Sequence, residues 1–244
     1  MRKTARFVGA NLLDLLCPRS CLGCADLIES EEPCRFLCSS CVAQIQWVQF
    51  PFCKKCGLPF FGDLVAVREC PNCVALSPSF DEGRAAFLLS GIGQSLVHAL
   101  KYRGVSKVLD DLPCLLEGSP SFSAFLEDAV LVPVPLHTRR FRMRGYNQAA
   151  LIARALAKIV SGAQYEELLV RSKSTPTQTD LPRGRRLKNV KNAFAPKAEA
   201  VMDVRRRYVI IDDVITTGAT LEACSRVLRK AGAIRVDVAA LGHG

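Results

Sequence analysis

The sequence predicts an α/β fold in which helices flank a parallel sheet, preceded by a small cysteine-rich domain. From about residue 80, short runs of apolar, often β-branched residues alternate with segments whose apolar residues recur at helical spacing. Strands that alternate with helices of about 10–15 residues are typical of a parallel sheet covered on both faces. Before residue 80, paired cysteines recur at regular intervals instead.

The elements of the α/β part follow from these patterns in chain order. Apolar runs mark the strands, and helical periodicity marks the helices, as where Leu151, Ala155 and Ile159 share one face. The expected strands are 84–90, 129–134, 165–170, 207–211 and 234–241, and the expected helices are 92–102, 107–116, 148–160 and 219–231. Ligands of parallel sheets bind at the carboxyl ends of the strands, so we expect the site there.

The cysteine spacing predicts two structural zinc ions. Thirteen residues separate the first C-x-x-C pair from the second, and thirteen separate the third from the fourth. The pairs are Cys21/Cys24, Cys38/Cys41, Cys53/Cys56 and Cys70/Cys73. Two such pairs supply the four thiolates of a closed tetrahedral zinc site. Sequential pairing makes two zinc ribbons in tandem, which the equal spacing favours, whereas alternating pairing makes a cross-brace.

Neither free thiols nor redox chemistry accounts for the cysteine pattern as well as zinc does. Buried free thiols do not predict equally spaced pairs, and no βαβ context suggests a redox motif. Cys17 and Cys34 stand outside the pattern and could replace a ligand, while Cys114 and Cys224 fall in helical patterns and are expected in the core. We expect a double zinc-ribbon domain at 1–78, beginning with a short helix, and an α/β domain at 79–244.

Charge is concentrated in one part of the chain. The net charge is +10, yet residues 137–197 alone carry fourteen Lys/Arg and three Asp/Glu, and residues 1–80 carry eight and seven. Such a basic segment attracts polyanions such as a pyrophosphate or a nucleic-acid backbone. No apolar run approaches the roughly 18 residues of a membrane span, and the N-terminus lacks a cleavage site. These features predict a cytoplasmic protein.

The segment from Tyr208 to Leu221 is the most informative in the chain. A β-branched run stops at two carboxylates, Asp212 and Asp213, and a loop of small and hydroxylated residues leads into a helical pattern. Free backbone N–H groups and the positive end of the helix dipole make such a loop a phosphate cradle. The residues expected to line it are Ile215, Thr216, Thr217, Gly218, Ala219 and Thr220. The carboxylates suit sugar hydroxyls or Mg²⁺ beside the phosphate.

Two basic segments could complete this site. Arg139, Arg140, Arg142 and Arg144 follow the strand at 129–134 and suit a loop that grips pyrophosphate, although a solvated basic surface is the alternative. Residues 171–194 are basic, polar and without hydrophobic periodicity. A loop this long is usually functional. It is either a lid over the site or a nucleic-acid-binding arm.

The strand, acid pair and T-x-G-x-T loop resemble the phosphoribosyl pyrophosphate (PRPP) motif of type I phosphoribosyltransferases. With the cysteine knuckles, Leu100-Lys101-Tyr102, the stretch Pro133-Val134-Pro135-Leu136 and Arg144-Gly145-Tyr146-Asn147-Gln148, nearly the whole chain resembles the ComF family of competence proteins. This resemblance implies a double zinc ribbon fused to a type I phosphoribosyltransferase-like domain. It also implies a role in DNA uptake and in handling single-stranded DNA.

The resemblance also implies roles for individual residues. PRPP, or a ribose 5-phosphate ligand, would place its 5′-phosphate in the cradle. Asp212 and Asp213 would hold the ribose diol and its Mg²⁺, and Arg139 and Arg140 would hold the pyrophosphate. From the resemblance we also expect the base-selecting loop of type I enzymes to be absent after the strand at 234–241. Either the zinc ribbons pack over the site in its place, or no base is bound.

Two functions of different class therefore remain open. The first is a Mg²⁺-dependent phosphoribosyltransferase that moves ribose 5-phosphate from PRPP to a nitrogen nucleophile. The second is a non-catalytic protein whose PRPP or phosphate site senses a metabolite while its basic face and zinc ribbons bind single-stranded DNA. The DNA-uptake machinery is a further expected partner. Phe141 and Tyr146 lie among the arginines and could stack on bases, although Tyr146 could equally be a packing residue.

Overall fold

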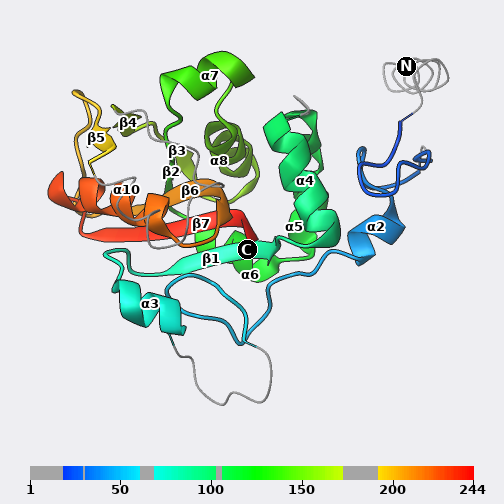
Figure 1. Cartoon of the computed structure of the whole chain (residues 1–244), viewed down its shortest axis with the longest axis horizontal. Helices are drawn as coiled ribbons and strands as arrows, with labels where there is room; N and C mark the ends of the chain where they lie inside the picture. Colours follow the sequence, from blue (N-terminus) through cyan, green and yellow to red (C-terminus); the bar gives the residue numbers. More distant parts are fainter. Residues whose placement is uncertain (1–18, 30, 61–68, 103–105, 173–191) are drawn as a thin grey trace.

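A computed structural model describes residues 19–29, 31–60, 69–102, 106–172 and 192–244 of the chain. At its centre lies a five-stranded sheet, with β1 (Gly83–Leu88), β7 (Arg235–His243), β6 (Arg207–Ile215), β2 (Val130–Pro133) and β3 (Gln164–Tyr165) in that spatial order. Every neighbouring pair of these strands is parallel. The predicted α/β class is thereby confirmed (Figure 1).

Helices cover both faces of the sheet. They are α4 (Gly91–Tyr102), the 3₁₀ helix η1 (Ser106–Asp111), α5 (Leu112–Glu117), α6 (Pro120–Leu126), α7 (Thr138–Arg144), α8 (Gln148–Ile159) and α10 (Ala219–Lys230). Alternate residues of β6 point to opposite faces because the side-chain period of a strand is two. Val209 and Ile211 pack in one apolar cluster with α4, α5, α6 and α8, while Tyr208 and Ile210 pack in another with α10.

The two cysteine-rich ribbons lie on opposite faces of this sheet. The first, with helix α2 (Ser39–Ala43), contributes to the α4–α8 cluster, and the second, with helix α3 (Pro71–Leu76), contributes to the α10 cluster. The segment between them runs along the edge strand β1, where Val48 N–H donates to the Ala86 carbonyl at 2.9 Å. Trp47 packs edge-on against Phe87 there, with ring centroids 6.2 Å apart. Both ribbons are therefore part of the packed protein.

Three expected elements have different limits in the structure. The motif strand β6 does not stop at residue 211 but continues to Ile215, because its pairing with β7 extends to Ile215 opposite His243. The expected strand at 165–170 is two strands: β3 pairs with β2, and β4 (Leu169–Arg171) pairs antiparallel with β5 (Phe194–Pro196). The helix expected at 107–116 is divided between η1 and α5.

The arginine segment after β2 is a helix and not the loop that we predicted. His137 caps α7, since its Nδ1 accepts the Arg139 N–H at 3.1 Å, and Gly145 ends the helix with a positive φ of 80°. A short polar helix rich in arginine carries no hydrophobic stripe, so periodicity could not reveal it. Helix α6 was also not predicted. The expected N-terminal helix, Cys17 and most of segment 171–194, including Arg183, Arg185 and Arg186, lie outside the described residues.

Within the described ranges, none of the helices is both long enough and apolar enough to cross a membrane.

Candidate functional site

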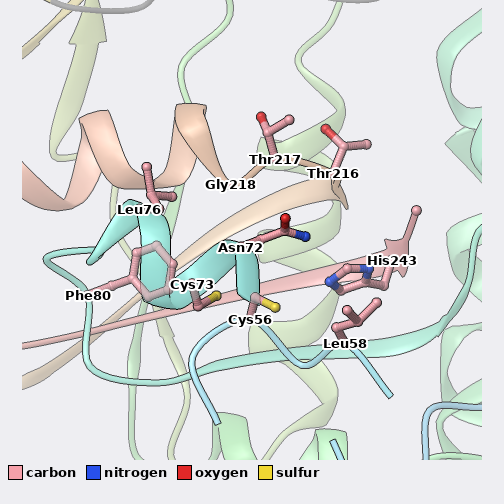
Figure 2. A pocket seen from close by; sticks show the side chains of 11 residues that line it. Cys56, Leu58, Asn72, Cys73, Leu76, Phe80, Thr216, Thr217, Gly218 and His243 are labelled. Carbon is pink, nitrogen blue, oxygen red and sulfur yellow. The ribbon is translucent and has the colours of Figure 1, made fainter. Parts of the chain in front are cut away.

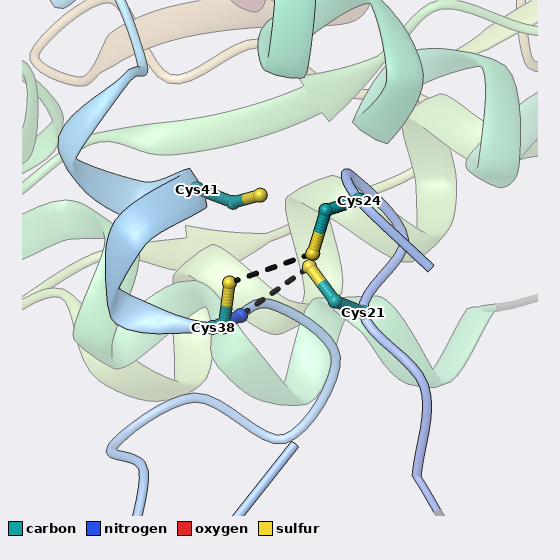
Figure 3. A group of neighbouring side chains, drawn as sticks. All are labelled: Cys21, Cys24, Cys38 and Cys41. Atoms are coloured by element: carbon teal, nitrogen blue, oxygen red, sulfur yellow. Dashed lines mark hydrogen bonds between the residues drawn. The ribbon is translucent and has the colours of Figure 1, made fainter. Parts of the chain in front are cut away.

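The eight paired cysteines form two separate groups of four sulphur atoms. Within each group the sulphurs lie within 4.8 Å of one another, and the groups are Cys21, Cys24, Cys38 and Cys41, and Cys53, Cys56, Cys70 and Cys73. This confirms sequential pairing and excludes the cross-brace. Four sulphurs bound at about 2.3 Å to one tetrahedral ion lie about 3.8 Å apart. The Sγ atoms of Cys24 and Cys38 in the first group are 3.8 Å apart (Figure 3). Those of Cys56 and Cys70 in the second group are 3.7 Å apart, so both groups fit zinc.

Backbone N–H groups support the thiolates from outside each group. Gly23 and Cys38 donate to Cys21 Sγ at 3.3 and 3.4 Å, and Cys70 donates to Cys53 Sγ at 3.2 Å. Such bonds stabilise a negatively charged sulphur. Cys34 does not replace a ligand, because its Sγ lies 2.7 Å from Cys114 Sγ and outside both groups.

The two zinc groups differ in their exposure. All four cysteines of the second group are buried, whereas Cys24 of the first group is exposed and Cys38 is half-buried. The second group also belongs to the apolar cluster that contains the motif strand β6 and helix α10. The second ribbon therefore packs beside the loop that leads from β6 into α10.

The two acids stand near the carboxyl end of β6. Asp213 is 8% exposed and pairs with Lys101 of α4, whose Nζ lies 3.2 Å from Asp213 Oδ1. Asp212 Oδ1 accepts the backbone N–H of Asp213 at 2.9 Å. Burial, together with the neighbouring Asp213 charge, raises the pKa of the Asp212 carboxyl to about 7. Two enclosed carboxylates beside one lysine form a site that would gain from a divalent cation.

The expected phosphate cradle joins β6 to α10. Gly218 adopts a positive φ of 71°, and α10 begins directly after it. Thr216 is exposed and Thr217 half-buried, so both can reach an anion. The side chains of Ile215 and Ala219 are 1% and 2% exposed and belong to the core, which leaves only their backbone to the cradle.

The structure separates the arginines of α7. Arg139 and Arg142 are exposed. Arg140 is half-buried, and among the described residues its buried Nη2 has no hydrogen-bond partner. Arg140 lies close enough to Arg171 of β4 that its charge, after burial, lowers the pKa of the Arg171 guanidinium, while Asp212 opposes this shift. Arg171 thus lies near Asp212 and Arg140 lies near Arg171, whereas Arg139 is exposed.

Two cations of the site, Lys101 and Arg171, were not assigned to it from the sequence. Lys101 belongs to the stretch Leu100-Lys101-Tyr102, for which the sequence indicated no role, and Arg171 is the first residue of the basic segment 171–194. Tyr146 is a packing residue, since its hydroxyl donates to the Leu100 carbonyl at 2.6 Å. This bond ties the end of α7 to α4 and so to Lys101.

A pocket lies between the cradle loop and the second zinc ribbon (Figure 2). Its walls include Leu58, Asn72 and Leu76 from the ribbon, and Gly218 and His243 from the sheet domain. His243 ends β7, beside the end of β6, and burial lowers its pKa to about 4. His243 was not predicted as a site residue because it lies in no motif.

The chain is similar to a known domain family and to several known proteins. Residues 12–74 match the model of the double zinc ribbon domain. Competence protein F of Haemophilus influenzae is 33% identical over 213 residues, which cover 83% of this chain and 88% of that protein. The DNA utilization protein YhgH of Escherichia coli K12 is 29% identical over 208 residues, with the same coverage of 83% and 88%. Competence protein ComFC of Bacillus subtilis is 26% identical over 217 residues, covering 82% of this chain and 81% of that one.

A solved structure of the allosteric regulatory enzyme of purine biosynthesis is also similar. The identity is 23% and the TM-score 0.32, and the match covers 58% of this chain and 25% of that enzyme's chain. A likeness of this size carries no argument about activity.

Proposed function

The chain belongs to the competence protein F family, and on this premise we propose that it binds PRPP with Mg²⁺ and acts in the uptake or use of DNA. One observation carries the first half of the proposal. Lys101 of α4 pairs with Asp213, Arg171 of β4 acts on the charge of Asp212, and Arg140 of α7 acts on that of Arg171. These cations support one anion-binding site beside the acid pair and the loop that leads into α10. The role in the uptake or use of DNA is supported by the names of two relatives, a competence protein and a DNA utilization protein.

Each group of residues would bind a different part of PRPP. Backbone N–H groups at the start of α10 and the hydroxyl of Thr217 would hold the 5′-phosphate. Asp212 and Asp213 would hold the ribose hydroxyls and Mg²⁺, which when bound neutralises pyrophosphate charge. Arg140 would hold the pyrophosphate, because its buried, unpartnered Nη2 can donate to a phosphate oxygen.

A phosphoribosyltransferase reaction is consistent with this arrangement. The lone pair of a nitrogen nucleophile would form the new bond to ribose C1. The C1–O bond would break, leaving its electrons on the pyrophosphate oxygen, and the proton of the nitrogen would go to water. Arg140 and Lys101 would stabilise the negative charge that develops on the leaving pyrophosphate.

Calorimetric titration of the zinc-loaded protein with PRPP and Mg²⁺ tests the binding. We expect Arg140→Ala to weaken PRPP affinity at least tenfold, because a charged hydrogen bond is lost in an enclosed site. Arg142→Ala, an exposed arginine on the same helix, is the matched control and should bind like the wild type. Equal affinities for the wild type and Arg140→Ala would place the PRPP site elsewhere. A pyrophosphate-release assay with a panel of bases then tests turnover.

The second candidate function, PRPP sensing coupled to single-stranded DNA binding, is favoured by the outer face of α7. Arg139 and Arg142 are exposed there, with Phe141 49% and Met143 79% exposed beside them. Cations interleaved with an exposed aromatic ring suit a nucleic-acid backbone and an unstacked base. PRPP binding without pyrophosphate release, together with DNA binding that needs Arg139 and Arg142, would favour this function over catalysis.

A further inference from the structure

The pocket beside the cradle has the features of a ligand site. It lies at the carboxyl ends of β6 and β7, and the second zinc ribbon forms its other wall. The cavity has a volume of about 60 Å³, which is room for a few water molecules or for part of a planar ring. The cradle residues Thr216, Thr217 and Gly218 line it too, so it continues directly from the expected 5′-phosphate position.

His243 is the main sign that a polar ligand enters this pocket. Its side chain is 4% exposed, and among the described residues neither Nδ1 nor Nε2 has a hydrogen-bond partner. An imidazole has two nitrogens that seek partners, and leaving buried polar groups unsatisfied is costly. The sulphurs of Cys56 and Cys73 also line the pocket, yet neither is a hydrogen-bond partner of the imidazole.

Asn72 faces His243 across the pocket. It stands on α3 of the second ribbon, and Figure 2 shows its amide and the His243 ring pointing toward each other. No hydrogen bond of the amide to another described residue is present, so its donor and acceptor are available. Leu58, Leu76 and Phe80 supply apolar surface around these polar groups. The pocket therefore combines flat apolar contacts with a few convergent hydrogen-bonding groups.

The charge of the lining identifies the class of ligand. Of the described residues that line the pocket, none is Lys, Arg, Asp or Glu, so beyond the cradle the pocket offers an anion no side-chain counter-charge. An uncharged planar ring with ring nitrogens and exocyclic donors or acceptors fits both the polar pair and the apolar walls. We propose that this pocket binds the nitrogen heterocycle of a nucleobase, held between His243 and Asn72, with the second zinc ribbon as its wall.

This inference rests on the proposed function, because it names the acceptor that would meet the phosphoribosyl group. It also gives the second ribbon a role in recognition, since α3 lies against the cradle: a Cβ added at Gly218 would meet Leu76 at 3.9 Å. The sheet domain alone offers His243 but no facing wall. A base-binding pocket would thus be built from two parts of the chain that lie about 170 residues apart.

The test compares ligands with and without a base on the zinc-loaded full chain. Calorimetry measures ribose 5-phosphate and the 5′-monophosphates of adenosine, guanosine, cytidine and uridine. We expect at least one monophosphate to bind about tenfold or more tightly than ribose 5-phosphate, since the base adds two hydrogen bonds and apolar burial. Asn72→Ala and His243→Leu should each bring this ratio close to one while leaving the ribose 5-phosphate affinity unchanged.

Controls separate this inference from misfolding and from the proposed function. Val74→Ala, at a side chain 66% exposed on the same short helix, should keep the wild-type ratio. His243→Leu should melt no earlier than the wild type, because it removes unsatisfied buried nitrogens. If ribose 5-phosphate binds but no base adds affinity, or the ratio survives both variants, the base pocket is overturned and the phosphate site stands. If neither ribose 5-phosphate nor PRPP binds, both proposals fail.

Discussion

Lys101 and Asp213 form an ion pair across the candidate site, with 3.2 Å between Nζ and Oδ1. Lys101 lies in the last turn of α4, which packs on one face of the sheet, and Asp213 belongs to the central strand β6. The side chains are 26% and 12% exposed, so solvent screens the pair only in part. Without a ligand, Lys101 is the cation that balances the enclosed carboxylate, and it lies where the phosphoribosyl ligand and its Mg²⁺ are proposed to bind.

Removing this lysine should destabilise the free protein and help to show where Mg²⁺ binds. Lys101→Met leaves Asp213 without its cation, and we expect a loss of about 1–2 kcal/mol in the free energy of unfolding, measured with urea. Mg²⁺ with PRPP should restore part of this loss if it binds beside Asp213. Lys158→Met, at an exposed lysine of α8, is the control and should change stability little. A variant as stable as the wild type would show that the pair contributes nothing.

Ligand binding should depend on pH through Asp212. The pKa of this carboxyl is raised to about 7, so it is mostly neutral below that pH and mostly charged above it. A neutral carboxyl attracts Mg²⁺ less, so the affinity for PRPP with Mg²⁺ should fall as the pH is lowered from 8 to 6. Calorimetry across this range measures the slope. Asp212→Asn cannot titrate, and we expect it to bind more weakly with a flatter pH profile.

The two zinc ions should leave the protein at different rates. Cys24 is exposed and Cys38 half-buried in the first group, whereas all cysteines of the second group are buried. A chelator with a metal indicator should therefore release one equivalent quickly and a second slowly, for a total of two per chain. Cys24→Ser should abolish the fast phase. Cys53→Ser should instead lower thermal stability and PRPP affinity together, because the second ribbon packs against β6 and α10.

Single-stranded DNA binding should separate from PRPP binding within helix α7. Charge reversal of the exposed Arg139 and Arg142 should weaken binding to a labelled oligonucleotide and leave PRPP binding intact. Arg140→Ala should instead weaken PRPP binding and leave DNA binding intact. Fluorescence anisotropy should show affinity falling with salt, with a log–log slope of roughly −0.7 for each phosphate neutralised. Binding that ignores salt, or survives reversal of Arg139 and Arg142, would remove α7 as the DNA surface.

Competition between the two ligands forms a separate prediction. If pyrophosphate and DNA share cations near α7, saturating PRPP should weaken DNA binding, and DNA should weaken PRPP binding by the same factor. The inward position of Arg140 and the outward position of Arg139 predict that this factor is small. Adding PRPP to the preformed DNA complex in the anisotropy assay measures it. A loss of DNA binding at saturating PRPP would show that the outer arginines also hold the pyrophosphate.

Features that depend on local stereochemistry could be predicted from the order of the amino acids. Two cysteines at C-x-x-C spacing define a zinc knuckle wherever they occur, and β-branched runs and helical spacing mark β6 and α10 without knowledge of their neighbours. The acid pair and the Gly218 loop could be predicted for the same reason, because the strand, the loop and the start of the helix are contiguous in the sequence. The double ribbon and the parallel sheet could therefore be predicted, whereas the arginine segment looked like a loop because a short polar helix has no apolar stripe.

Contacts between residues that are far apart in the chain could not be predicted in this way, because they depend on how the elements pack. Lys101 reaches Asp213 because α4 packs beside the strand end, and Arg140 turns inward while Arg139 turns out because of the phase of α7. The strand order brings His243 beside the end of β6, and the second ribbon brings Asn72 opposite it. No local spacing encodes these contacts, since each depends on how strands and ribbons far apart in the chain pack together.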